Sequence, residues 1–596
     1  MARKIILALY SLLWIFIIFT EYLFQHYWYA DAARNFQYYG FLIPLLVGIG
    51  GFAWLRNKNQ GRANSYRVLN GLGLYALSFV IVLVTTAIFF SKYEGSDFDL
   101  ADASKLGANY IGVSLAVYIC VGYAYLLGDL LLTLFPINMP ARELFVVKIA
   151  LGIMFWVALL FLLGTLDLLY PFVLLPLFSL SALLNVKGGK DFVRHTLLKP
   201  ISLSPQLNLI GIASFVVLLT FVTLNFTQNI RPIPIGYDAM TLYMRIPSLI
   251  RDYNGLIQGH GMYNWSLFMS LGFVLFNSTA VALELSFVGG PLALSALYAL
   301  SRRLMNTNLA LLTCAIFYTM PEVNFLSYQD TKIDLGLLFI SICAVLLLVN
   351  WINPYQEIEA DEDQLADTKL ESQRTKFKRA SSKERKKNAL IRKKKVQEKK
   401  QTVMVNSQAP TFLLRFRDKL HRKTPKVLEG QHLIVWLGLL IGFSMGIKIT
   451  SLLLLLGVLV AMWYVKGDAI SALGVLFMCL FGILLFRLDE QPGMRDWHAN
   501  VSYLQWLLAG CGFGLLGWEA INKRNLLLAN IKRSFILITF SLIAMSPWLL
   551  KNISETGQLN TDALLNGQKA IPQFKDIRME TLEKNWKNKQ ALGKPD

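Results

Sequence analysis

Long apolar runs separated by short polar stretches recur along the whole chain. A helix needs about 20 apolar residues to cross the hydrocarbon core of a bilayer. With Lys and Arg kept on the cytoplasmic side, the pattern predicts an all-α, polytopic transmembrane protein with about 15 spans. The predicted spans lie near 5–24, 40–55, 68–91, 110–135, 143–165, 168–186, 206–226, 279–300, 309–326, 333–352, 433–447, 451–466, 469–486, 504–520 and 533–550.

One apolar run, from Trp265 to Phe276, is too short to cross and is typical of an interfacial or re-entrant helix. If it crossed, the most basic segment of the chain would lie outside, against the positive-inside rule. The predicted parts are an N-terminal transmembrane extension (1–205), a core with an outer loop at 227–263 (206–352), a charged, disordered cytoplasmic loop (353–432), C-terminal helices (433–550) and an extracytoplasmic tail (551–596).

Composition supports a membrane protein. Of 596 residues, 55% are hydrophobic and 16% are charged, whereas soluble proteins have about 25% charged residues. This excludes a soluble enzyme, a disordered chain and a disulfide scaffold. The five cysteines lie in apolar spans without a CxxC pair, so neither a zinc site nor a disulfide framework is indicated.

The net charge of +20 would suggest a nucleic-acid partner if it formed a stripe. Half of it lies in the 353–432 insert, which is too poor in large apolar residues to form a core. We therefore predict a solvated cytoplasmic loop that anionic lipid headgroups attract, and no nucleic-acid partner.

The first candidate site residue is Asp238, in the predicted outer loop. Pro232, Pro234 and Gly236 exclude a continuous helix before it, so Asp238 begins a short helical run. Its carboxylate suits either a helix N-cap or a general base, and the local sequence leaves both open.

A second outer cluster runs from Tyr328 to Asp334 between two apolar spans. Asp330 and Asp334 are spaced i, i+4, which predicts one helix face. A carboxylate within an apolar stretch indicates function, and a local pair with Lys332 is the alternative.

Three cations are candidates for binding a phosphate on the outer side. Lys448 interrupts the apolar stretch from Leu433 to Val465, and Arg231 and Arg245 lie in the outer loop. Snorkelling to the interface is the alternative for Lys448. Motifs for NTP hydrolysis, serine hydrolysis and zinc proteolysis are absent from the sequence. The N-x-[ST] triplets, Asn264 among them, are too short to carry weight.

Four short motifs resemble, in the same order, those of the bacterial GT-C superfamily of membrane glycosyltransferases. They are Tyr237-Asp238-Ala239-Met240-Thr241-Leu242-Tyr243, Tyr328 to Leu335, Gly442 to Thr450, and Pro547-Trp548-Leu549-Leu550-Lys551-Asn552 with Thr556-Gly557. The resemblance covers about 206–557. Tyr243 stands where a histidine is common, and 1–205 is an additional helical segment.

The resemblance implies a GT-C-like fold and a multi-pass enzyme of the cytoplasmic membrane with its site on the outer side. Such an enzyme transfers a sugar from a polyprenyl-phosphate donor to a glycan, lipid or protein acceptor, with inversion. Asp238 would be the general base, and Lys448, Lys332, Arg245 and Arg231 would bind the donor phosphate. Tyr328, Gln329, Asp330 and Asp334 would form the second motif, and Tyr237 and Tyr243 would contact the acceptor or sugar.

Some alternatives stay open. No cofactor is indicated, and a divalent cation is undecided, with Asp330 and Asp334 as its candidate ligands. A transporter or flippase of lipid-linked glycans or small molecules would use the same charges as a path. A glycan polymerase or ligase would share the outer chemistry, and a scaffold would use the basic insert.

Overall fold

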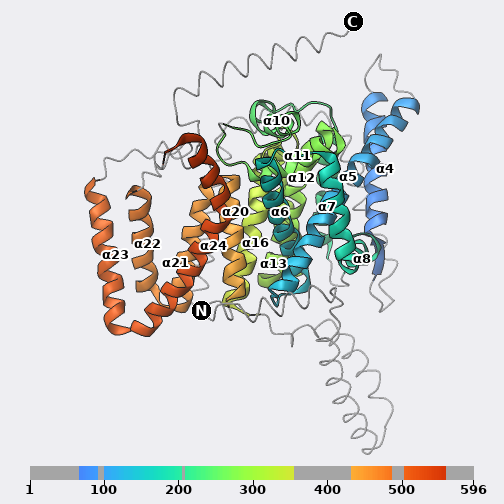
Figure 1. Cartoon of the computed structure of the whole chain (residues 1–596). Coiled ribbons are helices and arrows are strands. Elements are labelled where there is room, and N and C mark those ends of the chain that lie inside the picture. Colours follow the sequence, from blue (N-terminus) through green and yellow to red (C-terminus); the bar gives the residue numbers. More distant parts are fainter. Residues whose placement is uncertain are drawn as a thin grey trace, which may run out of the picture. The chain divides into compact units, whose positions relative to one another are not determined.

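The computed structural model describes residues 66–91, 100–203, 208–258, 260–354, 431–485 and 502–558. The chain divides into unit 1 (Met1–Cys120, Val193–Asn254 and Trp265–Phe339) and unit 2 (Val121–Phe192, Gly255–Asn264 and Ile340–Asp596). Figure 1 shows their elements coloured along the sequence. The predicted spans at 5–24 and 40–55, most of the 353–432 loop and most of the 551–596 tail lie outside the described residues.

The elements of unit 1 are mostly helices. They are β1 (Tyr66–Asn70), α4 (Gly71–Ser91), the turn η2 (Arg194–Leu198), β2 (Pro200–Leu203), α9 (Leu209–Asn229), the turn η3 (Ala239–Tyr243), α10 (Arg245–Tyr253), nearly all of α11 (Asn264–Phe276), α12 (Thr279–Phe287), α13 (Gly289–Leu304), α14 (Thr307–Thr319) and α15 (Pro321–Tyr328). The division between the units falls inside α5 (Leu100–Leu134) and α16 (Asp334–Ile352).

Unit 2 is helical in the part that the structure describes. Its elements are α6 (Ala141–Thr165), α7 (Pro171–Leu184), α8 (Val186–Val193), α20 (His432–Ile447), the turn η6 (Ile449–Ser451), α21 (Leu452–Lys466), α22 (Ala469–Leu485), α23 (Ser502–Asn522) and α24 (Arg524–Thr556). In Figure 1 the helices from α20 to α24 form one group at the orange and red end of the colour scale.

Eight of the described helices are long and apolar enough to cross a membrane. The number rises to as many as ten if each of two bent helix pairs is one span, and shorter apolar helices of 10–17 residues add to these. A helix satisfies its own backbone hydrogen bonds, which makes it suited to the bilayer interior. The chain is therefore a helical, multi-pass membrane protein, as predicted.

Two short strands accompany the helices. β1 and β2 pair antiparallel, with Tyr66 opposite Leu203 and Asn70 opposite Pro200. At the end of β1, Asn70 Oδ1 accepts a hydrogen bond of 2.8 Å from the Gly73 N–H and so caps the first turn of α4. This cap accounts for the start of α4 just after the strand.

The predicted span at 309–326 is two helices, because α14 and α15 are bent by 66°. Pro321 begins α15 and has no backbone N–H to continue α14. A residue before proline avoids helical angles, and Met320 accordingly has φ −55° and ψ 133°. The bend carries the chain to Tyr328, where the predicted second motif begins.

The predicted span at 168–186 is also bent, by 86° between α7 and the segment from Val186 to Leu198. Asn185 lies at the break. Its Nδ2 donates to Asp129 Oδ2 over 2.9 Å, and its Oδ1 accepts from the Gly188 N–H over 2.9 Å. The second bond caps α8, so the Asn185 side chain joins the start of α8 to Asp129 of α5.

The short helix α11 has 13 residues, close to the predicted length. Its side chains are almost all buried, with Trp265, Leu267 and Phe268 fully enclosed. An interfacial helix would expose one apolar face to lipid. The burial therefore favours a core element over a helix on the membrane surface.

Within unit 2, α20 packs directly against α24. A Cβ on Gly442 would lie 2.0 Å from the Ser541 carbonyl oxygen, so only glycine permits this approach. Ser541 Oγ in turn donates to the Gly438 carbonyl over 3.0 Å. Small residues commonly bring membrane helices together in this way. The glycines of the predicted Gly442 to Thr450 motif therefore have a packing role.

Candidate functional site

Asp238, Asp330 and Lys332 form an ion-pair cluster in unit 1. Lys332 Nζ lies 2.6 Å from Asp238 Oδ2 and 2.9 Å from Asp330 Oδ2. Asp238 lies just before η3, whereas the other two residues lie in the turn between α15 and α16. The structure thus brings together the predicted outer loop (227–263) and the second predicted motif, which are far apart in the sequence.

The three side chains differ in exposure. The exposed fraction is 46% for Asp238, 21% for Lys332 and 7% for Asp330. Burial alone would lower the pKa of Lys332, but hydrogen bonds to both carboxylates outweigh it and raise this pKa above its ordinary value. Lys332 therefore stays charged, with its ammonium directed at two carboxylates. Asp238 is the most exposed of the three side chains.

Asp238 does not cap the helical run that it begins. Its backbone angles are helical, with φ −68° and ψ −34°, and its side chain makes no capping bond. Asp330 Oδ1 instead accepts a 2.9 Å hydrogen bond from the Ala239 N–H. The capping interpretation of Asp238 is therefore wrong, and the buried Asp330 takes this role from a distant segment.

Asp330 and Asp334 do not share a helix face. α15 ends at Tyr328 and α16 begins at Asp334, so the chain between them is not helical and the i, i+4 spacing has no helical meaning. Local pairing with Lys332 is observed for Asp330. Asp334 opens the first turn of α16, where a carboxylate is favoured by the helix dipole.

Gly236 allows the loop before η3 to pack closely against Asp330. A Cβ at this position would lie 2.1 Å from Asp330 Oδ1 and 2.4 Å from its Cα. Any side chain would push the loop away from Asp330 and break its bond to Ala239. The glycine that signalled a turn in the sequence is thus required for a close approach.

Arg231 ties the loop after α9 to the second predicted motif. Its Nη2 donates to the Tyr328 carbonyl over 2.7 Å and reaches the Gln329 carbonyl at 3.4 Å. Burial lowers the pKa of Arg231. Tyr328 and Gln329 therefore take part through backbone oxygens, and Arg231, predicted to bind phosphate, is already engaged as a tether.

The two tyrosines of the first motif lie in different environments. Tyr237 is 78% exposed. Tyr243 is half-buried, and burial, together with the negative charges of Asp334 and Asp238, raises its pKa to about 12. Its hydroxyl is therefore neutral at physiological pH and keeps a proton to donate.

Arg245 is the least engaged cation of the predicted set. It begins α10 and is half-buried. Its guanidinium makes no ion pair or hydrogen bond within the described ranges. By contrast, Arg251 on the same helix pairs with Asp252 at 2.7 Å and donates to Asn277 Oδ1 over 2.8 Å.

Lys448 belongs to unit 2. It follows α20 in an extended conformation, with φ −153° and ψ 126°, and its side chain is exposed. Its backbone N–H donates to the Ser444 carbonyl over 3.0 Å. The predicted turn is present, so the lysine is presented at the end of the helix.

Within unit 2, the C-terminal motif contacts the segment from His260 to Asn264. Trp548 Nε1 donates to Asn264 Oδ1 over 2.6 Å, and Asn264 Nδ2 donates to the Phe443 carbonyl over 2.9 Å. Lys551 Nζ reaches the His260 carbonyl at 3.0 Å and pairs with Glu555 at 2.8 Å. Apart from its triplet, no sequence pattern marks Asn264, because its partners Trp548 and Phe443 are distant along the chain.

No cluster of three or more His, Cys, Asp or Glu side chains suited to a metal occurs in the part of the chain that the structure describes. Asp330 is occupied by Lys332 and the Ala239 N–H. The residues present therefore do not form a metal site, and the arrangement is that of an accessible carboxylate held by a lysine. No protein-family model, curated protein or solved structure matches this chain.

Proposed function

We propose that the chain is a membrane glycosyltransferase of the GT-C type. In this proposal it has about 15 spans and its site lies on the outer side of the cytoplasmic membrane. It transfers a sugar from a polyprenyl-phosphate donor to an acceptor hydroxyl, with Asp238 as general base. The observation that carries the proposal is the half-exposed Asp238 carboxylate, fixed by Lys332, in a chain rich in helices apolar and long enough to cross a membrane.

The geometry supports a base rather than a structural carboxylate. A general base must be accessible, held in one orientation and within hydrogen-bond reach of the hydroxyl. Lys332 holds one Asp238 oxygen and leaves half of the side chain exposed, while Asp330 supplies the capping bond that Asp238 does not make. The two carboxylates thus have separate tasks.

The proposed reaction is one displacement. The acceptor hydroxyl oxygen forms a bond to the anomeric carbon while the bond from that carbon to the phosphate oxygen breaks. The hydroxyl proton passes to Asp238, and the electron pair leaves with polyprenyl phosphate. Attack from the side opposite the leaving group inverts the anomeric centre.

Phosphate stabilisation is assigned chiefly to Arg245. A guanidinium without a carboxylate partner can bind two phosphate oxygens as their charge grows. Lys332 and Arg231 are directed at oxygen atoms of the protein. The neutral hydroxyl of Tyr243 suits a contact with a sugar or acceptor hydroxyl.

The test uses the purified full-length protein in lipid nanodiscs with a radiolabelled polyprenyl-phosphate sugar and a panel of hydroxyl acceptors. Release of polyprenyl phosphate and labelling of the acceptor are measured together. We expect Asp238→Asn to reduce transfer at least about a hundredfold, the lower range for loss of a general base.

The matched control is Asp252→Asn, which removes a carboxylate on α10 that pairs only with its neighbour Arg251 among the described residues. It should transfer at the wild-type rate. Full activity of Asp238→Asn would remove Asp238 from the mechanism. Sugar-lipid movement across liposomes without release of polyprenyl phosphate would instead establish a flippase.

A further inference from the structure

Two cations face one tryptophan in unit 2. Lys466 Nζ lies 5.1 Å from the centre of the Trp351 ring, and Arg533 Cζ lies 5.8 Å from it. Trp351 is in the last turn of α16, Lys466 ends α21 and Arg533 lies in the first part of α24. Three helices thus bring two like charges to one side chain.

Neither cation is neutralised within the described residues. Arg533 Nη1 donates to the neutral Asn530 Oδ1 over 2.7 Å, and no carboxylate pairs with it or with Lys466 in these ranges. Two cations at one tryptophan, neither of them paired with a carboxylate in these ranges, favour an anionic partner.

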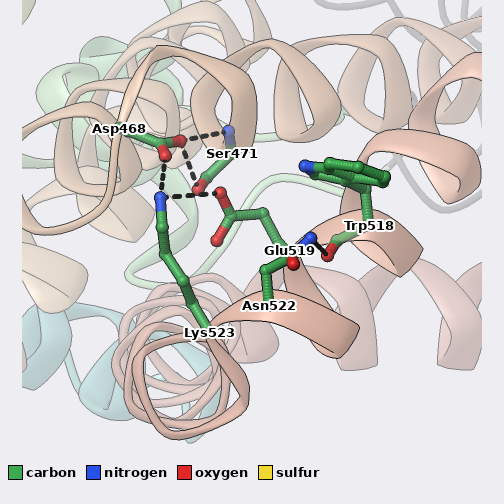
Figure 2. Close-up of polar contacts among 6 residues, drawn as sticks. All are labelled: Asp468, Ser471, Trp518, Glu519, Asn522 and Lys523. Carbon is green, nitrogen blue, oxygen red and sulfur yellow. Dashed lines mark hydrogen bonds and ion pairs between the residues drawn. The ribbon is translucent and has the colours of Figure 1, made fainter.

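The nearby carboxylates of unit 2 are already used, as Figure 2 shows. Lys523 pairs with Asp468 and with Glu519, which lies 3.4 Å from its Nζ. Asp468 Oδ1 also accepts hydrogen bonds of 2.9 Å from the N–H and the Oγ of Ser471. These acids hold the turn between α21 and α22 to the turn between α23 and α24.

The helix dipole explains the position of only one of the two cations. Lys466 lies in the last turn of α21, where the helix dipole favours a cation. Arg533 lies well inside α24, beyond the reach of such an end effect. Tryptophan and basic side chains together are typical of the membrane interface, where lipid headgroups lie.

The helices beside the two cations expose apolar side chains along their length. On α24 these include Ile531, Phe535 and Leu542, and on α21 Leu453 and Val465. Acyl chains can lie along such surfaces while a headgroup remains at the tryptophan. A soluble anion would gain nothing from them.

We propose that Lys466, Arg533 and Trp351 bind the phosphate of an anionic phospholipid. The two cations contact the phosphate oxygens, the indole packs against the headgroup and the acyl chains follow α21 and α24. This site is independent of the proposed transferase activity, because its ligand is a structural lipid rather than a donor.

The test is native mass spectrometry of the full-length protein, titrated with phosphatidylglycerol or phosphatidylcholine of identical acyl chains. We expect phosphatidylglycerol to bind more tightly. A cation near an anionic headgroup contributes about a fivefold factor in affinity, so Lys466→Gln with Arg533→Gln should lower phosphatidylglycerol affinity about 25-fold. Phosphatidylcholine binding should change little.

The control is Arg524→Gln with Lys532→Gln, which removes two exposed cations of α24 and should keep the lipid preference. The exchanged pair Lys466→Arg with Arg533→Lys preserves charge and should also keep it, which separates charge loss from misfolding. An unchanged preference in the double glutamine variant would overturn the site. Displacement of phosphatidylglycerol by equimolar inorganic phosphate would overturn its assignment to a lipid.

Discussion

Lys332 Nζ lies 2.6 Å from Asp238 Oδ2, so the turn before α16 fixes a carboxylate of the loop after α9. This contact makes the position of Asp238 depend on residues that follow Tyr328. The conformation of the loop after α9 therefore depends on a few side chains. Substituting these side chains one at a time separates their contributions.

Asp330→Ala should lower the stability of the folded protein by about 2 kcal/mol, because the Ala239 N–H loses its buried acceptor. Asp330→Asn keeps an acceptor oxygen and should cost less. Thermal unfolding of the purified protein in detergent measures both. Equal losses for the two variants would assign the effect to charge rather than to the capping bond.

Gly236→Ala should destabilise the loop by roughly 1–3 kcal/mol, the usual cost of overpacking. The added methyl would lie 2.1 Å from Asp330 Oδ1, so the loop has to move outward. In the proposed reaction, transfer should fall with it. Gly457→Ala in α21 is the control, because a Cβ there meets no atom within 4 Å. Equal melting temperatures for both variants would contradict the close approach.

Asn264→Ala should destabilise unit 2 by about 2–3 kcal/mol, since it leaves the Trp548 Nε1 donor and the Phe443 carbonyl without their partner. Asn525→Ala changes an exposed asparagine of α24 and should have no effect. Intrinsic tryptophan fluorescence during denaturation reports the change. A variant as stable as the wild type would show that Asn264 is dispensable.

Asp468→Asn should have a pH-dependent effect. The hydrogen bond from Lys523 holds the pKa of Asp468 below its ordinary value. A depressed folded-state pKa stabilises the fold above the unfolded value of about 3.9, and this stabilisation is lost as the pH falls below it. The melting-temperature difference from wild type should therefore be largest at pH 7 and shrink from pH 5 to pH 3. A constant difference would disprove this linkage.

The helices were predictable from sequence because apolar length sets them. The observed α6, α16 and α24 enclose the predicted spans almost completely. The bends were not predicted, although Pro321 marks one of them. At the other bend, Asn185 acts through partners as distant as Asp129, and local sequence does not identify these.

The sequence predicts which residues come together in the candidate site better than it predicts what each of them does. Charged residues within an apolar chain indicated Asp238, Asp330 and Lys332, and all three meet. Their division of tasks depends on which carboxylate is buried, and burial follows from tertiary packing. For the same reason Arg231 had the signature of a phosphate ligand but lies against the carbonyls of Tyr328 and Gln329.

The cluster of Asp238, Lys332 and Asp330 has two carboxylates for one ammonium, which leaves one negative charge in excess. Such a cluster repels a phosphate and tolerates a neutral hydroxyl. In the proposed reaction, the excess negative charge would orient the amphiphilic donor. Its phosphate would be excluded from the Asp238 side and drawn to Arg245, so that the sugar carbon lies between the leaving group and the base.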